Sequence, residues 1–375
     1  MRLLFIANAS SPLVQNLAIE LKRCRPGLVI DIISDNKPPS TAASGAFDRI
    51  IAPSGGRWLR RTRGVKFLWF AWQHRRSLTR SSGGYDAVHL FYLSAIWGAL
   101  ANRLRSKAPR MLITLFGSDV YRSFWPLTWF QKRLLMRADR YTTSNPHTVG
   151  FARELFDLDL LPCDELLFGL RSLEHMRDLR AEFRDGSRQL LGIDPESVVV
   201  ACGYNGSSNQ NHAAILKAVE GLPKELRDRL FLLLPMTSGG SMSYLRGIEA
   251  QLVDLGVPYR VFTSRLDDLD VARIRMATDI LVQVQKTDQL SGSMIEHLYA
   301  GNVLLTGAWL PYALLTEHKL RYWTTSSLDQ LGADLFKCIS ELETRRIMCA
   351  GNREIVWGLT AWERTAPRWS ALYGA

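Results

Sequence analysis

One short stretch of the sequence combines a cation, two carboxylates and a glycine flanked by serines. It runs from Lys286 to Glu296 and directly follows an apolar, strand-like run. We expect a helix to begin near Ser291 or Ser293, where the free backbone amides of Ser291, Gly292 and Ser293 would face a phosphate. Lys286 would add a point charge for that phosphate. Glu296, one turn into the helix, could reach a ribose hydroxyl.

Helix capping is a competing interpretation of the same stretch. Ser293 and Glu296 have the spacing of a capping box, and Gly301 suits the C-terminal end of the helix. Capping does not explain why Asp288 and Gln289 follow the strand so closely, beside a lysine. We therefore expect this stretch to bind a ligand that carries phosphate.

A second polar loop, at 203–211, follows another apolar run and leads into a helix. Its small, amide and hydroxyl side chains, together with backbone donors, could bind a diphosphate. The residues we assign to this contact are Gly203, Asn205, Ser207, Ser208, Asn209 and His212. Here too capping competes, because Ser207 and Gln210 have the capping-box spacing, and His212 could be a polar helix residue.

Polar residues also follow apolar runs in the first half of the chain. Asp119, with Gly117 before it, could act as a general base or bind the hydroxyl of an acceptor. Helix capping is an equal alternative for Asp119. Ser10, after the first apolar run, and His147, in a third loop, complete the candidate acceptor residues.

The spacing of apolar runs predicts the elements that must position these residues. Runs such as 2–7, 28–34, 87–93 and 111–117 alternate with helical segments, which is typical of βαβ units and parallel sheets. The pattern restarts near 197, so we expect two doubly wound α/β domains facing across a cleft, with ligands beyond the carboxyl ends of the strands. The expected bounds are 1–170 for the first domain, 171–190 for a linker, 191–355 for the second domain and 356–375 for a C-terminal helix that could return to the first.

The composition is informative about the class of protein to which the chain belongs. The chain has 375 residues, 47% hydrophobic and 22% charged, which is typical of a globular protein. The longest apolar run is about 12 residues, against the roughly 20 needed to span a bilayer. The five cysteines lack metal-ligand spacing, and their odd number argues against a disulfide framework, so we expect a cytoplasmic protein. The net charge of +11 favours an anionic partner.

The positive charge is concentrated in two segments that also carry tryptophan and phenylalanine, 57–80 and 103–140. Three interpretations fit this composition. The segments could meet an anionic membrane surface, bind single-stranded nucleic acid, or form solvated helix faces whose aromatic side chains point inward. No zinc-finger, helix-turn-helix or RNA-recognition signature supports nucleic acid, and we expect none as a partner.

The sequence lacks the motifs of several common nucleotide-binding and enzyme classes. The sequence has no G-x-G-x-x-G after the first strand, no P-loop and no G-x-S-x-G elbow, which disfavours dinucleotide, P-loop and hydrolase functions. Asp268 and Asp270 have the spacing of a metal-binding pair, but they open a predicted helix, where acidic residues are favourable. We expect no metal site.

Three further segments resemble the GT-B glycosyltransferases: GSDV at 117–120, ADRYTTSNPH at 138–147 and EHLYAG at 296–301. Retaining members of those families carry two acids separated by seven residues. Asp288 and Glu296 have that spacing, with Asp in place of the usual first Glu. The 203–216 segment is also similar to bacterial 4-acetamido-4,6-dideoxygalactose (Fuc4NAc) transferases.

The resemblance implies an activity and its partners. It implies a hexosyltransferase-type enzyme that moves a sugar from a nucleoside-diphosphate donor to a hydroxyl of a glycan or lipid-linked acceptor, in bacterial polysaccharide, lipopolysaccharide or O-antigen synthesis. It favours retention, with Glu296 as a catalytic candidate, and Asp119 is the other catalytic candidate, as the first base to test in an inverting enzyme. Lys286 or Arg265 would supply charge, and we expect no cofactor or obligatory metal. We also expect peripheral association with the anionic inner membrane. The rival hypotheses are a nucleic-acid-binding protein and a sugar-nucleotide epimerase of the same architecture.

Overall fold

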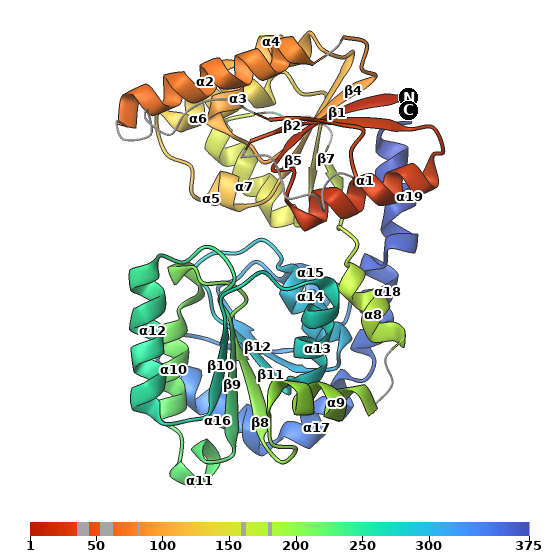
Figure 1. The fold of residues 1–375 in the computed structure, drawn as a ribbon. Helices are drawn as coiled ribbons and strands as arrows, with labels where there is room; N and C mark the ends of the chain where they lie inside the picture. The colour runs from red at the N-terminus through yellow and green to blue at the C-terminus, as the bar shows by residue number, and fades with distance from the viewer. Residues whose placement is uncertain (36–44, 53–62, 82, 159–162, 179–181, 375) are drawn as a thin grey trace. The chain divides into compact units, whose positions relative to one another are not determined.

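The computed structural model describes residues 1–35, 45–52, 63–81, 83–158, 163–178 and 182–374. The chain forms two compact units (Figure 1). The first unit comprises Met1–Gly169 together with Trp362–Ala375, and the second is Leu170–Ala361. Each unit is built around its own parallel sheet.

Seven parallel strands form the sheet of the first unit over the residues that the structure describes, in the order β3-β2-β1-β4-β5-β6-β7. The strands are β1 (Arg2–Ala7), β2 (Val29–Ser34), β3 (Arg49–Ile51), β4 (Ala87–Phe91), β5 (Arg110–Leu115), β6 (Arg140–Thr143) and β7 (Cys163–Glu165). The helices are α1 (Pro12–Cys24), α2 (Arg63–Arg80), α3 (Ala95–Ala99), α4 (Ala101–Arg105), α5 (Ser118–Tyr121), α6 (Leu127–Leu135), α7 (Pro146–Phe156) and α19 (Trp362–Leu372).

Helices cover both faces of this sheet, so its strands are apolar on both sides. On one face, the core contains side chains from α2 to α7, including Leu78, Trp97 and Leu134. On the other face α1 and α19 pack together, and α19 contributes Trp362 and Trp369. The strand order reverses between β1 and β4, and the loops that follow these two strands therefore diverge.

The C-terminal helix completes the first unit. The indole nitrogen of Trp369 donates to the carbonyl of Leu167 at 2.9 Å, and Arg25 donates to Ser370 at 2.7 Å. A Cβ on Gly169 would lie 2.2 Å from the ring of Trp362, so this position requires glycine. The C-terminal helix expected at 356–375 corresponds to two helices, the end of α18 (Asn352–Thr360) and α19, and α17 (Leu342–Cys349) precedes them.

The second unit has a six-stranded parallel sheet among the described residues, in the order β10-β9-β8-β11-β12-β13. The strands are β8 (Val198–Cys202), β9 (Leu230–Pro235), β10 (Tyr259–Phe262), β11 (Ile280–Gln283), β12 (Val303–Gly307) and β13 (Trp323–Thr325). Besides α17 and α18, its helices are α8 (Arg171–Asp178), α9 (Glu182–Leu191), α10 (His212–Glu220), α11 (Lys224–Arg227), α12 (Met242–Leu255), α13 (Asp268–Ala277), α14 (Gly292–Tyr299), α15 (Ala313–Glu317) and α16 (Leu331–Ser340), with a 3-10 turn at Ser208–Gln210. Here the strand order reverses between β8 and β11.

The segment expected to be a linker, 171–190, has a different structure. It contains α8 and α9, which pack against α13, and its Leu173 and Met176 are fully buried in the second core. Two of its charged residues, Arg184 and Arg188, bind the buried carboxylate of Asp279. Asp279 also accepts the backbone amide of Val199 at 2.8 Å, which ties these helices to β8.

Asp279 provides a test of this packing. Asp279→Asn should lower the free energy of unfolding by about 3–5 kcal/mol, because it leaves buried arginine without its opposite charge. Asp270→Asn is the matched control, since Asp270 pairs with Arg273 at the surface, and should cost at most about 1 kcal/mol. Chemical denaturation measures both. Equal losses in the two variants would contradict the role given to Asp279.

Candidate functional site

The loops that follow β8 and β11 are bound to each other at the point where the strand order of the second sheet reverses. The amide of Lys286 donates to the carbonyl of Asn209 at 2.9 Å, and the Asn209 side chain donates to the carbonyl of Thr287 at 2.8 Å. Asn211 donates to the carbonyl of Val284 at 2.7 Å. The two loops predicted from sequence to bind phosphate are therefore neighbours, at the position where doubly wound sheets bind ligands.

Four buried polar atoms at these loops have no hydrogen-bond partner within the described part of the chain. They are Gln210 Nε2, His212 Nε2, Gln285 Oε1 and Ser293 Oγ. Each belongs to a side chain that is at most 8% exposed. Leaving such a group unpaired costs about 1–3 kcal/mol, so the four in these two neighbouring loops are candidates to bind a polar ligand.

Gly203 lies beside one of these atoms, His212 Nε2, and beside the side chain of Gln210. Its φ is +64°, and a Cβ at this position would lie 2.9 Å from Gln210 Oε1 and 3.2 Å from His212 Nε2. Burial lowers the pKa of His212 to about 4, so the imidazole is neutral at pH 7. Its Nδ1 lies 3.0 Å from the hydroxyl of Tyr244. Nε2 can therefore offer a ligand a hydrogen bond without a charge.

The helix that follows β11 begins as expected but is capped differently. Ser291 is the N-cap, and its hydroxyl accepts the amide of Met294 at 3.1 Å and donates to Gln283 Oε1 at the same distance. The alternative capping box of Ser293 with Glu296 is therefore wrong. Because Ser293 caps nothing, its hydroxyl is available to a ligand at the helix N-terminus.

The carboxylate of Glu296 binds two protein side chains. Ser172 donates to Oε1 at 2.6 Å, and Arg275 donates to Oε2 at 3.0 Å. The residue is 9% exposed. Its assignment to a ribose hydroxyl stays a prediction, and Glu296 also has a structural role because it neutralises buried Arg275.

Asp288 lies in a network of side chains that the sequence did not reveal. Tyr312 donates to its Oδ2 at 2.7 Å and Tyr204 to its Oδ1 at 3.2 Å. The Tyr312 hydroxyl in turn accepts from Gln283 and Gln285 at 2.9 and 3.0 Å. Burial raises the pKa of Asp288. The sequence signal for this network was the pair of glutamines at the end of a buried strand.

The remaining predicted residues lie in the same two loops. Lys286 is exposed and Gln289 is buried. Asn205 accepts the amide of Ser207 at 2.9 Å, and the Ser207 hydroxyl accepts the amide of Asn209 at 3.3 Å, so these side chains shape the turn that Ser208 begins. In the capping-box alternative, the Gln210 side chain would accept a hydrogen bond from the backbone amide of Ser207. It instead accepts one from the backbone amide of Tyr204 at 3.2 Å.

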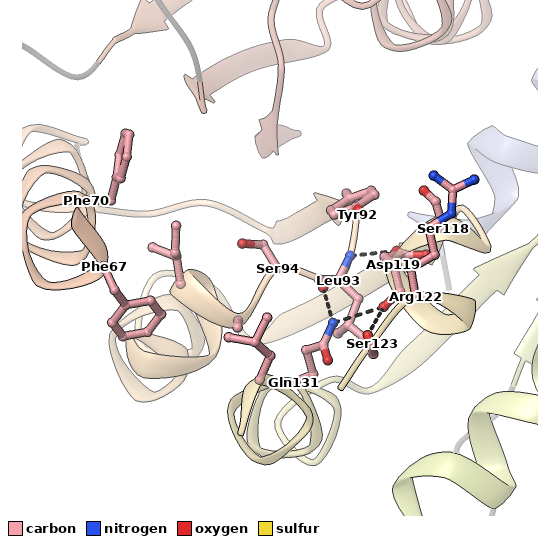
Figure 2. Close-up of a pocket in the computed structure, with 13 residues that line it drawn as sticks. Phe67, Phe70, Tyr92, Leu93, Ser94, Ser118, Asp119, Arg122, Ser123 and Gln131 are labelled. Carbon is pink, nitrogen blue, oxygen red and sulfur yellow. Dashed lines mark hydrogen bonds between the residues drawn. The ribbon is translucent and has the colours of Figure 1, made fainter. Parts of the chain in front are cut away.

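The first unit has a pocket of about 580 Å³ beyond the ends of β4 and β5 (Figure 2). Of the predicted acceptor residues, Asp119 lines it, and Gly117 directly precedes α5 at its edge. Ser10 and His147 are not among the lining residues. Sequence reasoning missed most of the lining, namely Phe67, Phe70, Tyr92, Leu93, Ser94, Ala95, Ile96, Ser118, Arg122, Ser123, Leu127 and Gln131.

Asp119 connects the two loops that frame this pocket. Its Oδ2 accepts the amide of Leu93 at 2.7 Å and its Oδ1 accepts the amide of Phe116 at 3.0 Å. Burial raises its pKa to about 6, although these hydrogen bonds oppose the shift. Both oxygens bind backbone amides outside α5, and the N-cap of that helix is Gly117, which has no side-chain cap bond. The geometry therefore favours a role in holding the two loops together over both helix capping and general-base catalysis.

Tyr92 has an unusual backbone conformation at the same pocket. Its φ is +97°, a value that costs a residue other than glycine roughly 1–3 kcal/mol. The side chain is 42% exposed, and its hydroxyl bonds to Ser118. Such strain persists where the surrounding structure imposes it, often at a binding site.

Over the described residues, no cluster of three or more His, Cys, Asp or Glu side chains could hold a metal ion. The Asp-x-Asp pair at 268 and 270 opens α13, as predicted. Asp267 is the N-cap of this helix, and its side chain accepts the amide of Asp270 at 2.7 Å.

Comparison with known proteins bears mainly on the fold. A family model described as "Glycosyl transferase 4-like" matches residues 2–145. No curated protein sequence matches the chain. Sucrose-phosphate synthase from Thermosynechococcus elongatus is similar in structure, with a TM-score of 0.78 at 17% identity, covering 100% of this chain and 98% of that one.

Two further solved structures cover almost all of the chain. HepE from Anabaena, in complex with UDP and glucose, has a TM-score of 0.75 at 12% identity, with 100% of both chains covered. WaaG, a glycosyltransferase involved in lipopolysaccharide biosynthesis, has a TM-score of 0.72 at 15% identity, with 99% of both covered. The predicted fold class is confirmed: the chain has the GT-B fold, with two Rossmann-like α/β domains.

The role of Asp119 can be tested by an isosteric substitution. Asp119→Asn should lower the free energy of unfolding by about 1–3 kcal/mol, because the new NH2 group faces an amide donor. Asp157→Asn, at an exposed carboxylate of the same unit, should change it little. Chemical denaturation measures both variants. A fully stable Asp119→Asn protein that had lost catalytic activity would restore the general-base interpretation.

Proposed function

We propose that this protein is a glycosyltransferase that moves a sugar from a nucleoside-diphosphate donor to a hydroxyl acceptor. The observation that carries the proposal is the group of four unpartnered buried polar atoms at the strand-order reversal of the second sheet. The family model over the first unit supports it. So do structural neighbours with UDP or UDP-glucose bound.

The second unit offers the groups that a diphosphate needs. The first amides of α14 and the hydroxyl of Ser293 lie at the helix N-terminus, and Lys286 precedes them in the same loop. As the sugar leaves, negative charge develops on the diphosphate, and preset donors of this kind stabilise it. His212 and Gln285 add neutral hydrogen bonds for the nucleotide or the sugar.

We further propose that these groups suffice without a metal ion or other cofactor, and that transfer occurs with retention. Helix amides and a lysine can replace the cation that would otherwise neutralise the diphosphate. Retention is suggested by the spacing of Asp288 and Glu296. The nucleic-acid and epimerase hypotheses are less favoured, because a nucleic-acid role leaves the polar atoms of the second unit unexplained.

For the acceptor we propose a glycan or lipid-linked saccharide of bacterial polysaccharide synthesis. The structural likeness to WaaG supports this choice, as does the surface of the first unit. We give the name aromatic surface to a set of exposed apolar side chains on α2, in the loop before α6, on α6 and at its C-cap: Leu68, Trp72, Phe124, Trp125, Trp129 and Met136. The relation to Fuc4NAc transferases stays a prediction.

The aromatic surface carries cations beside its rings. Arg76 lies over Trp72 at 4.3 Å, and Arg133 over Trp129 at 6.0 Å. Trp125 is 81% exposed, so inward-pointing aromatics do not explain this segment. Such a surface suits an anionic membrane. Of the basic segment 57–80, residues 57–62 lie outside the described residues. No described helix is both long and apolar enough to cross a bilayer.

Donor binding tests the first proposal. In calorimetry with excess EDTA, at least one of UDP, GDP, ADP and dTDP should bind. Lys286→Gln should weaken that binding about tenfold, as expected for a lost charged hydrogen bond. Lys217→Gln, an equal charge change at an exposed position on α10, should leave it unchanged. Binding that required magnesium, or equal affinity in both variants, would contradict this donor site.

Vesicle sedimentation tests the membrane proposal. The protein should sediment with vesicles containing anionic lipid, and about 0.5 M salt should release it because exposed charges are then screened. Arg133→Glu with Arg137→Glu should reverse two contributions of about 1 kcal/mol each and abolish binding. Lys224→Glu with Arg227→Glu, on α11 of the second unit, is the control. A protein that ignores anionic vesicles at low salt would refute peripheral association.

A further inference from the structure

We propose that Trp309 is a platform for the transferred sugar, with the C–H face of a pyranose ring stacked on its indole. The inference rests on the proposed glycosyltransferase function and names a residue that distinguishes a nucleotide sugar from the free nucleoside diphosphate. Trp309 lies in the loop 308–312, which follows β12 and leads to α15. Sequence reasoning assigned no role to this loop.

The loop after β12 is attached to the candidate donor site at two points. Because β12 is the neighbour of β11, the loops that follow these two strands begin at the same edge of the sheet. The indole nitrogen of Trp309 donates to the carbonyl of Gln285 at 2.8 Å, and the hydroxyl of Tyr312 donates to Asp288 at 2.7 Å. Gln285 directly precedes Lys286, the cation assigned to the phosphate. Trp309 is therefore bonded to the segment in which we place the diphosphate.

The ring of Trp309 is exposed and yet held in one orientation. Its exposed fraction is 40%, whereas Leu310 and Tyr312 of the same loop are buried. The hydrogen bond to Gln285 holds the polar edge of the indole. The six-membered ring lies on Gly307, where a Cβ would come within 2.5 Å of Cε2 and Cζ2, so only glycine leaves room for it. An aromatic surface that is already fixed loses little conformational entropy when a ligand covers it.

The positions of the other groups favour the sugar over the base as the occupant. Glu296, the residue assigned to the ribose, faces α8 and α13, because it is bonded to Ser172 and Arg275. Trp309 is bonded instead to the residue before Lys286. A nucleotide with its ribose at Glu296 and its phosphates at the start of α14 leaves the loop after β12 to the sugar. An aromatic ring buries the C–H face of a sugar and leaves its hydroxyls to polar neighbours.

Calorimetry on the full chain tests the platform with matched ligands. The probes are the nucleoside diphosphate that binds best among UDP, GDP, ADP and dTDP, and its conjugates with glucose and galactose. Trp309→Ala should weaken the tighter conjugate roughly tenfold, because the sugar loses its apolar contact, and should leave the free nucleoside diphosphate unchanged. Trp309→Phe should restore most of the lost affinity. Trp72→Ala, at a similarly exposed indole of the first unit, is the control.

Gly307→Ala tests whether the ring must rest on a glycine. The added Cβ displaces the indole, so this variant should weaken the same conjugate roughly fivefold. In the Trp309→Ala background it should have no further effect, because the group that it displaces is absent. General damage to the fold would instead add to the first loss. Gly247→Ala, where a Cβ meets nothing within 4 Å, is the matched control, and thermal unfolding reports whether each variant is folded.

Failure of this proposal can be told apart from failure of the proposed function. If Trp309→Ala weakens the free nucleoside diphosphate as much as its conjugate, the indole contacts the nucleoside and the sugar platform is wrong. It is also wrong if neither ligand is weakened, or if the effects of Gly307→Ala and Trp309→Ala add. In each of these outcomes, nucleoside diphosphate binding to the wild-type protein leaves the glycosyltransferase proposal standing. If no nucleoside diphosphate or conjugate binds, the proposed function fails and the platform fails with it.

Discussion

The reversal of strand order in the second parallel sheet is the constraint on which the candidate donor site depends, whereas the pocket of the first unit lies beyond the neighbouring strands β4 and β5. Where neighbouring strands send their chains in opposite directions, the loops at the carboxyl ends separate and leave room for a ligand. In the second unit this occurs between β8 and β11, and in the first between β1 and β4. The buried backbone and side-chain polar groups of those loops must still find hydrogen-bond partners. In the second unit, Asn209 and Asn211 join the two loops. Among the described residues of these loops, Gln210 Nε2, His212 Nε2, Gln285 Oε1 and Ser293 Oγ have no hydrogen-bond partner in the protein.

Burial of the strands on both faces explains why the fold could be predicted from sequence. Strands buried on both faces are continuous apolar runs, and polar residues appear only where such a run reaches its end. The strands at Arg2–Ala7, Val198–Cys202 and Ile280–Gln283 were found in this way, together with the loops that follow them. The short edge strands β7 and β13 were missed, because Cys163–Glu165 and Trp323–Thr325 contain no continuous apolar run.

Within the sites, what sequence could not predict depends on contacts between distant residues. The bond from Ser172 to Glu296 joins positions 124 residues apart, and no local spacing indicates it. Tyr312 reaches Asp288 from the loop after the next strand. Local spacing also misled: Ser293 and Glu296 look like a capping box, but Ser291 caps the helix. The backbone conformation of Tyr92 has no sequence signal at all, because tyrosine does not favour a positive φ.

A crystal structure of the complex with the nucleoside diphosphate that binds best would test the central claim most directly. The account predicts a diphosphate within hydrogen-bonding distance of the Gly292 and Ser293 amides, with Lys286 at the phosphate and His212 Nε2 or Gln285 Oε1 bonded to the ligand. A nucleotide bound in the first unit, or bound to the second unit away from the loops after β8 and β11, would contradict it.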